Sequence, residues 1–263
     1  MNRSESLRGI GLRVFLALIA VLGILVGTLA TVEATAAAEQ QIREPAIAGT
    51  WYSGLPGELR QQVMSFLAGV PAAKAAAPDR VVALIAPHAG YAYSGQVAAY
   101  AYKQIDGHPV DTVVVIAPSH RVPFSGVAVY DRGGFRTPLG VMEIDRELIA
   151  ALEKKDKQIR FVPDAHTREH AIEIQLPFVQ ALLPKAKLVP LLMGDQDRAM
   201  CEALADALAS VCAGKSVLIV ASSDLSHFHS YDDAKKLDQV VLDRVNEFDP
   251  NGLLDALAQD RKS

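Results

Sequence analysis

Histidine and aspartate side chains, which bind metals and move protons, follow three short apolar runs of this 263-residue chain. His88 and His120 come shortly after the first two runs, and Asp224 and His227 follow the third. The runs are residues 83–86, 113–117 and 217–221. Imidazole nitrogens bind metals and exchange protons near neutral pH, and a carboxylate beside them raises their basicity. These four residues are therefore candidates for a metal-dependent or proton-transferring site.

The apolar runs have the length of buried strands, which explains how residues far apart in sequence could meet. In an open α/β sheet, the carboxyl ends of parallel strands lie along one edge, where ligands bind. We therefore expect His88, His120, Asp224 and His227 in a single pocket. One histidine at such a position is more often structural, but two strand-end histidines that each follow Ala-Pro favour a functional role.

Asp224 and His227 are three residues apart. If residues 224–227 open a helical turn, both side chains share a face and can hydrogen-bond. A carboxylate there fixes the imidazole tautomer, so this pair is our candidate for catalytic proton transfer, with His227 as the base. The alternative is that Asp224 only caps the helix that follows.

A fourth polar cluster precedes an apolar stretch. We predict a helix from Glu169 to Leu183, with His170 and Glu173 on one face. That face could bind substrate as a pocket wall, or it could be a solvated surface with salt bridges. Tyr91, in the loop after His88, could also bind substrate or could simply cover the sheet edge. The second histidine of an H-E-x-x-H motif is missing, which excludes a zincin.

Strands and helices alternate along the chain. We predict strands at 81–86, 112–117, 126–130, 187–192 and 216–221, and helices at 58–67, 95–104, 145–155, 169–183, 197–212 and 232–247. This alternation predicts one α/β domain with a mixed or mainly parallel central sheet flanked by helices. No G-x-S-x-G elbow, P-loop or G-x-G-x-x-G fingerprint follows a strand, so phosphoryl transfer and nicotinamide chemistry are poorly supported.

The first 38 residues have the pattern of an export segment. Three arginines precede an uncharged apolar run at 14–32, and small residues follow. We predict a cleaved signal peptide, with an uncleaved N-terminal membrane anchor as the alternative. In either case, the domain of residues 39–263 is extracytoplasmic. It is secreted or periplasmic if the segment is cleaved, and it faces outward from the membrane if the segment is an anchor. The formal net charge of −4 argues against nucleic-acid binding.

These motifs, in this order, resemble the Memo family, also called AmmeMemoRadiSam system protein B. The matching stretches are Ala48-Gly49-Thr50-Trp51-Tyr52, Ala86-Pro87-His88-Ala89-Gly90-Tyr91, Ala117-Pro118-Ser119-His120, Glu169-His170-Ala171-Ile172-Glu173, Gln175-Leu176-Pro177, and Ser222-Ser223-Asp224 with His227. The resemblance covers roughly residues 43–260. It implies a fold similar to class III extradiol dioxygenases, which are non-haem iron enzymes. It also implies that His88 and His120 are metal ligands, and that Asp224 and His227 share their pocket.

The resemblance also implies a third metal ligand. In the family this ligand is a cysteine in a Cys-Gly stretch, shortly after the helix that here ends near Phe248. This sequence stops at Ser263, about where that stretch should begin, and neither Cys201 nor Cys212 occupies an equivalent place. We therefore expect that the chain is truncated at its C-terminus. Without the cysteine, Asp224 or water could complete a weaker site.

Our first functional hypothesis is a metal-binding oxidoreductase of dioxygenase type. Two histidines, an anionic ligand and open positions suit a mononuclear non-haem iron site, with zinc or copper as alternatives. An exported protein takes up a divalent metal that is available outside the cytoplasm. The affinity order of divalent metals then favours copper and zinc over iron. A zinc hydrolase with His227 as its base is a further alternative. The competing class is a non-catalytic module that uses the same pocket for metal, a small molecule or a peptide; family members are described both as metal-binding proteins and as peptide-binding adaptors.

Overall fold

The computed structural model describes residues 41–71 and 80–260. The described residues from Ile42 onward belong to one compact unit. Residues 1–38 lie outside the described ranges, so the signal peptide or membrane anchor stays a prediction. Within those ranges, no helix is both long and apolar enough to cross a bilayer.

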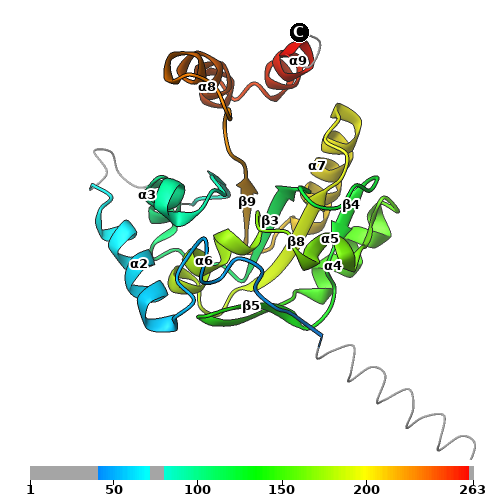
Figure 1. Ribbon diagram of the computed structural model, residues 1–263. Helices are drawn as coiled ribbons and strands as arrows, with labels where there is room; N and C mark the ends of the chain where they lie inside the picture. Colours follow the sequence, from blue (N-terminus) through cyan, green and yellow to red (C-terminus); the bar gives the residue numbers. More distant parts are fainter. Residues whose placement is uncertain (1–40, 72–79, 261–263) are drawn as a thin grey trace, which may run out of the picture. The chain divides into compact units, whose positions relative to one another are not determined.

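A six-stranded sheet carries the fold (Figure 1), in the order β2-β9-β3-β8-β4-β7. Its strands are β2 (Ala83–Ala86), β3 (Thr112–Pro118), β4 (Val127–Val129), β7 (Ile159–Phe161), β8 (Lys187–Met193) and β9 (Val217–Ser222). The strands β2, β9, β3 and β8 are parallel, whereas β4 pairs antiparallel with β8 and parallel with β7. The sheet is therefore mixed and mainly parallel, which confirms the predicted α/β class.

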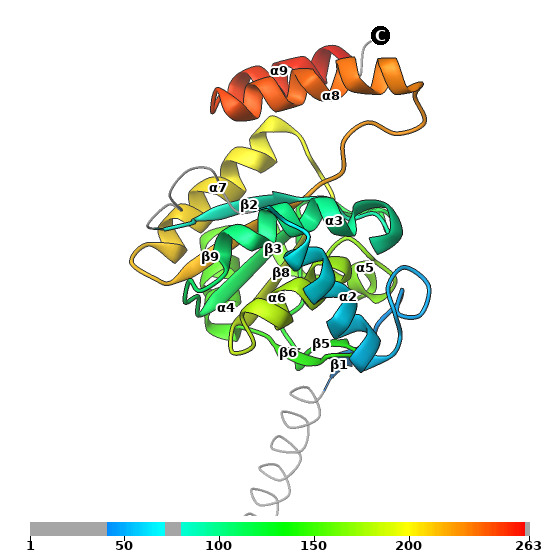
Figure 2. The ribbon, with the colours of Figure 1, turned by 90° about the vertical axis from the view of Figure 1, so that its left-hand side faces the viewer.

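Helices cover both faces of this sheet (Figure 1). On one side lie α2 (Pro56–Ala68), α3 (Tyr91–Tyr102) and α6 (Leu176–Leu182), and on the other lie α4 (Arg146–Lys155) and α7 (Arg198–Cys212). Strands between two helical layers need apolar side chains on both faces. In β3, Val113, Val114 and Val115 are accordingly fully buried. The remaining α-helices that the structure describes are α5 (Pro163–Thr167), α8 (Tyr231–Asn246) and α9 (Pro250–Asp260), and α8 and α9 lie side by side (Figure 2).

Helix ends agree with the caps that the sequence provides. The Asp145 side chain accepts a hydrogen bond from the Leu148 amide, 3.0 Å away, at the start of α4. Asp197 does the same for Met200 at the start of α7. The two cysteines are free and half-buried on α7, as their spacing along one helix requires.

A second, three-stranded sheet was not predicted. It has the order β1-β5-β6, with strands β1 (Ile42–Arg43), β5 (Gly134–Thr137) and β6 (Gly140–Glu143). Strands of two to four residues are too short to show a side-chain period of two in the sequence. Strand β1 begins the chain segment that contains Thr50 and Trp51, and this segment leads to the carboxyl edge of the main sheet.

The predicted helix over 169–183 is wrong in its first half. Residues 168–172 are irregular, a 3₁₀ turn covers Glu173–Gln175, and α6 begins only at Leu176. Pro177 explains the difference, because a proline lacks the N–H of a helix interior and fits only the first turn. His170 and Glu173 therefore do not share a helix face.

Candidate metal site

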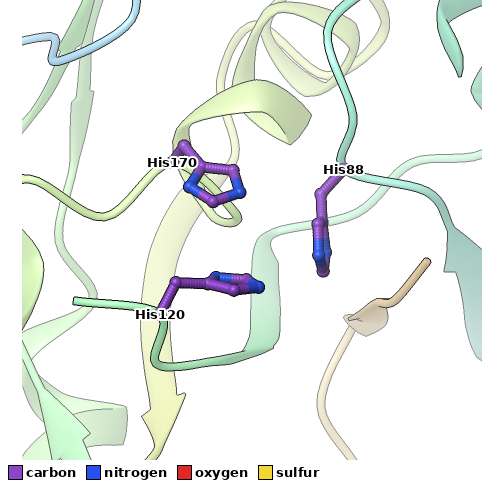
Figure 3. A group of neighbouring side chains, drawn as sticks. All are labelled: His88, His120 and His170. Atoms are coloured by element: carbon purple, nitrogen blue, oxygen red, sulfur yellow. The ribbon is translucent and has the colours of Figure 1, made fainter. Parts of the chain in front are cut away.

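Three imidazole rings converge at the carboxyl edge of the main sheet (Figure 3). His88, His120 and His170 each offer one ring nitrogen within 4.8 Å of the other two. The ring centroids are 5.1 Å apart for His88 and His120, and 4.5 Å apart for His120 and His170. Nitrogens this close, pointing toward a common centre, could all bind one metal ion.

The sheet topology positions the first two rings. His88 follows β2 and His120 follows β3, and both strands pair in parallel with β9. Their carboxyl ends therefore meet at one edge, as predicted from the apolar runs. His170 arrives from the irregular segment between α5 and the 3₁₀ turn.

A buried hydrogen-bond network determines which nitrogen of His88 is free. Ser222 Oγ donates to Ala171 O at 2.6 Å, so its single hydrogen is already used. It accepts from Gln175 Nε2 at 2.8 Å and lies 3.1 Å from His88 Nδ1. His88 Nδ1 must therefore carry a hydrogen and donate it to Ser222. This leaves Nε2 of the neutral ring with a free lone pair. Burial, the largest effect, lowers the pKa of His88 and keeps the ring neutral at neutral pH.

Glu169 makes the corresponding contact to the second ring. Its Oε1 lies 2.9 Å from His120 Nδ1, and its Oε2 accepts from the His120 amide at 2.6 Å. Burial of this carboxyl favours its neutral form, but hydrogen bonds from the His120 and Ala171 amides, together with the contact to the His120 ring, outweigh burial and lower the pKa of Glu169. A charged carboxylate only accepts, so His120 Nδ1 carries a hydrogen, and in the neutral ring this leaves Nε2 free.

His170 is the most enclosed of the three rings after His88. The residue is 7% exposed, and its ring lies against that of Trp51 with centroids 4.5 Å apart. Burial lowers the pKa of His170 to about 4, against the opposing effect of Glu169, so the ring is neutral at neutral pH. Its Nδ1 is buried and lies 3.2 Å from Glu169 Oε1, but it has no hydrogen bond of good geometry.

This donor set fits a divalent metal ion. Two rings are held as the tautomer with a free Nε2, all three are close, and the third has a buried nitrogen without a hydrogen bond. Neutral imidazoles are common ligands for zinc, copper and iron. Three protein ligands leave positions for a further ligand, which distinguishes reactive sites from closed structural ones.

Asp224 and His227 lie beside the three rings. Asp224 Oδ1 accepts from the His88 amide at 2.6 Å, and its Oδ2 is 3.7 Å from His88 Nε2 and 3.5 Å from His227 Nε2. The predicted helical turn is absent, because residues 223–230 are irregular and α8 begins at Tyr231. The alternative role as a helix cap also fails, since Ser230 caps α8. The contact between Asp224 and His227 forms within an irregular loop instead.

Two predicted substrate-binding residues do not reach this pocket. Tyr91 is the first residue of α3 and 2% exposed, and its hydroxyl donates to Ile174 O at 3.0 Å. Glu173 is completely buried and accepts from the Tyr52 hydroxyl at 2.6 Å. Both side chains stabilise the wall behind the pocket, and His170 alone of the three candidates lines it.

The pocket has a volume of about 490 Å³. Its walls include the three rings, Asp224 and His227, and its rim includes Thr50, Trp51, Ala89, Ala92 and Tyr93. Tyr93 is 88% exposed and His227 is exposed, so solvent and small molecules can enter.

Comparison with known proteins identifies the family. A sequence model described as Memo-like protein matches residues 43–263, which includes all the pocket residues. The chain belongs to the Memo family. The α/β architecture of the described residues is consistent with the implied similarity to class III extradiol dioxygenases.

Archaeal relatives in the family cover most of the chain. A MEMO1 family protein of Methanothermobacter thermautotrophicus is 34% identical over 228 residues, which are 83% of this chain and 81% of the relative. One from Nitrosopumilus maritimus is 30% identical over 223 residues, covering 84% and 81%. One from Sulfolobus acidocaldarius is 35% identical over 225 residues, covering 81% and 79%.

Sequence reasoning placed His170 in this Memo-family pocket but assigned it to the substrate wall. The structure places it instead as the third imidazole of the cluster. The sequence also did not reveal a role in the site for Glu169, which contacts the ring of His120, or for Ser222, which contacts the ring of His88. A signal was available, because Glu169 and His170 are adjacent polar residues before a proline that prevents a helix through them.

Proposed function

We propose that this Memo-family protein binds one divalent metal ion through His88, His120 and His170. The observation that carries the proposal is the convergence of three imidazole nitrogens within 4.8 Å of one another. The hydrogen bonds from His88 to Ser222 and from His120 to Glu169 support it, because they occupy Nδ1 and leave Nε2 of each neutral ring available for a metal.

The metal would act as a Lewis acid or, for iron or copper, as a redox centre for a small-molecule ligand. Iron is our first candidate through the family resemblance. The three imidazole nitrogens also suit zinc or copper, whereas the usual oxygen-activating iron site has two histidines and one carboxylate. Asp224 is the carboxylate beside the rings, 3.7 Å from His88 Nε2.

His227 and Asp224 would handle protons beside the metal. His227 Nδ1 lies 2.9 Å from Leu225 O, a carbonyl that can only accept, so the neutral ring carries its hydrogen there. Its Nε2 is therefore free to take a proton from a bound ligand. Asp224 Oδ2, 3.5 Å away, would stabilise the resulting imidazolium. Trp51 would limit access of water to His170.

As the reaction class, we propose an oxidoreductase of dioxygenase type acting on a chelating small molecule. A non-catalytic module that holds metal or a peptide is the second candidate. The exposed Tyr93 at the pocket rim favours it, because solvent reaches the pocket there and catalysis usually needs a pocket that excludes water. We also propose an extracytoplasmic location, supported by the pattern of residues 1–38 alone.

The first test compares the metal content of three proteins. Wild type, a His88→Ala/His120→Ala double variant and a His108→Ala control are purified and analysed for bound iron, zinc and copper. His108 is a half-buried histidine outside the pocket. We expect about one metal ion per chain in wild type and control, and none in the double variant. Equal metal content in all three would contradict metal binding at this pocket.

Activity separates the two candidate functions. Iron-loaded wild type is mixed with catechols, and oxygen uptake is followed with an oxygen electrode. Uptake that disappears in a His227→Ala variant with unchanged metal content supports the oxidoreductase. Metal binding without oxygen uptake supports the binding module.

A further inference from the structure

We propose that Glu169 is the positioning residue of the three-imidazole site. Its carboxylate sets the tautomer of His120 and fixes that ring relative to His170. The inference rests on the proposed metal-binding function and adds a residue that would not bind the metal itself.

The geometry of the carboxylate supports this role. Glu169 is 2% exposed and contacts both histidines. Its Oε1 accepts from the amides of His170 and Ala171, at 2.9 and 3.0 Å, and contacts His120 Nδ1 at 2.9 Å. Its Oε2 accepts from the His120 amide at 2.6 Å. One buried carboxylate thus joins the backbone and the ring of His120 to the backbone of His170.

Other elements of the fold do not provide this positioning. His120 follows β3 in an irregular loop, and its side chain is 37% exposed. The segment around His170 is also irregular. His88 differs, since it is 4% exposed and tied to Ser222. Side chains on loops need a second contact to hold a metal-binding geometry, and a carboxylate behind the histidine supplies one.

The carboxylate also selects the nitrogen that faces the pocket. A free neutral imidazole carries its hydrogen mainly on Nε2, which would leave that atom unable to bind a metal. Because Glu169 can only accept, His120 must carry the hydrogen on Nδ1. In the neutral ring, Nε2 is therefore free to bind a metal.

The first test uses metal-free wild-type protein. Long-range ¹H–¹⁵N NMR spectra of ¹⁵N-labelled histidines distinguish the two neutral tautomers, and a His120→Gln variant assigns the signal. We expect the Nδ1–H pattern for His120 at pH 7.5. An Nε2–H pattern, or rapid averaging of the two, would overturn the inference without reference to any variant of Glu169.

The second test measures metal affinity. Glu169→Gln keeps the size of the side chain but loses its charge, and its NH₂ group must face an N–H donor. We expect zinc affinity, measured by chelator competition, to weaken about 10- to 100-fold. The visible bands of bound Co²⁺ should also change. Glu202→Gln, at an exposed glutamate of α7, is the matched control and should behave as wild type.

The outcomes separate this inference from the function on which it rests. Zinc affinity within 3-fold of wild type and identical Co²⁺ bands in Glu169→Gln would overturn the positioning role and leave metal binding intact. If wild type binds neither metal, the proposed function fails, and the tautomer spectrum still decides whether Glu169 orients His120.

Discussion

Glu173 provides the sharpest test of how the wall behind the pocket is held. It is completely buried and pairs with Arg43, which is 4% exposed. It also accepts from the Ala46 amide at 2.7 Å and the Ile47 amide at 3.1 Å, besides the hydroxyl of Tyr52. These contacts attach the segment that leads to the pocket rim to the 3₁₀ turn.

We predict that Glu173→Ala destabilises the protein strongly. Removing one partner of a buried ion pair leaves the other charge unpaired, which costs about 3–5 kcal/mol. Tyr52→Phe keeps the ion pair and removes one hydrogen bond to a charged group, so it should cost less, about 1.5–3 kcal/mol. A double Arg43→Met/Glu173→Ala variant should lose less than the sum of the two single changes, because no unpaired charge remains.

The assay is urea unfolding followed by fluorescence, with circular dichroism as a second probe. Trp51 is the single tryptophan of the sequence and reports directly on the rim segment. A loss below about 1 kcal/mol for Glu173→Ala would refute the reasoning. If Glu173 instead bound substrate, as the sequence suggested, its removal would change ligand affinity with little effect on unfolding.

Burial lowers the pKa of His166 to about 3 from 6.5, so the unfolded chain binds more protons between these values and stability falls as pH falls. From pH 6.5 to 5 the loss due to His166 is about 2 kcal/mol, and urea titrations should show it in wild type but not in His166→Gln. Asp145→Ala should lower stability by about 1–2 kcal/mol through loss of the α4 cap, whereas Asp145→Asn should cost less; thermal unfolding measures both. Zinc at 100 times its Kd should stabilise wild type by about 2.7 kcal/mol in urea titrations and should not stabilise His88→Ala.

The sequence was sufficient to predict the edge of the sheet that carries the pocket. His88, His120 and Asp224 each follow an apolar run that became a parallel strand, and parallel strand ends meet by geometry. The order of the strands was not predictable, because β9 lies between β2 and β3 although it comes last in the chain.

The third imidazole was harder to find. His170 lies in a segment whose apolar spacing resembles a helix, but Pro177 confines the helix to residues after 175. Glu169 then satisfies backbone amides that a helix would have used. Only tertiary contacts, such as the ring of Trp51 against His170, bring this residue to the pocket. Local patterns cannot report them.

The central claim is that three imidazoles form the metal site, and the His170→Ala variant tests it most directly. Zinc affinity is measured by chelator competition for wild type, for His170→Ala and for the His108→Ala control. We predict one site per chain in wild type and control, and an affinity at least about 100-fold weaker in His170→Ala, because a lost ligand should cost at least as much as a lost supporting contact. Zinc affinity in His170→Ala equal to that of wild type would contradict the claim.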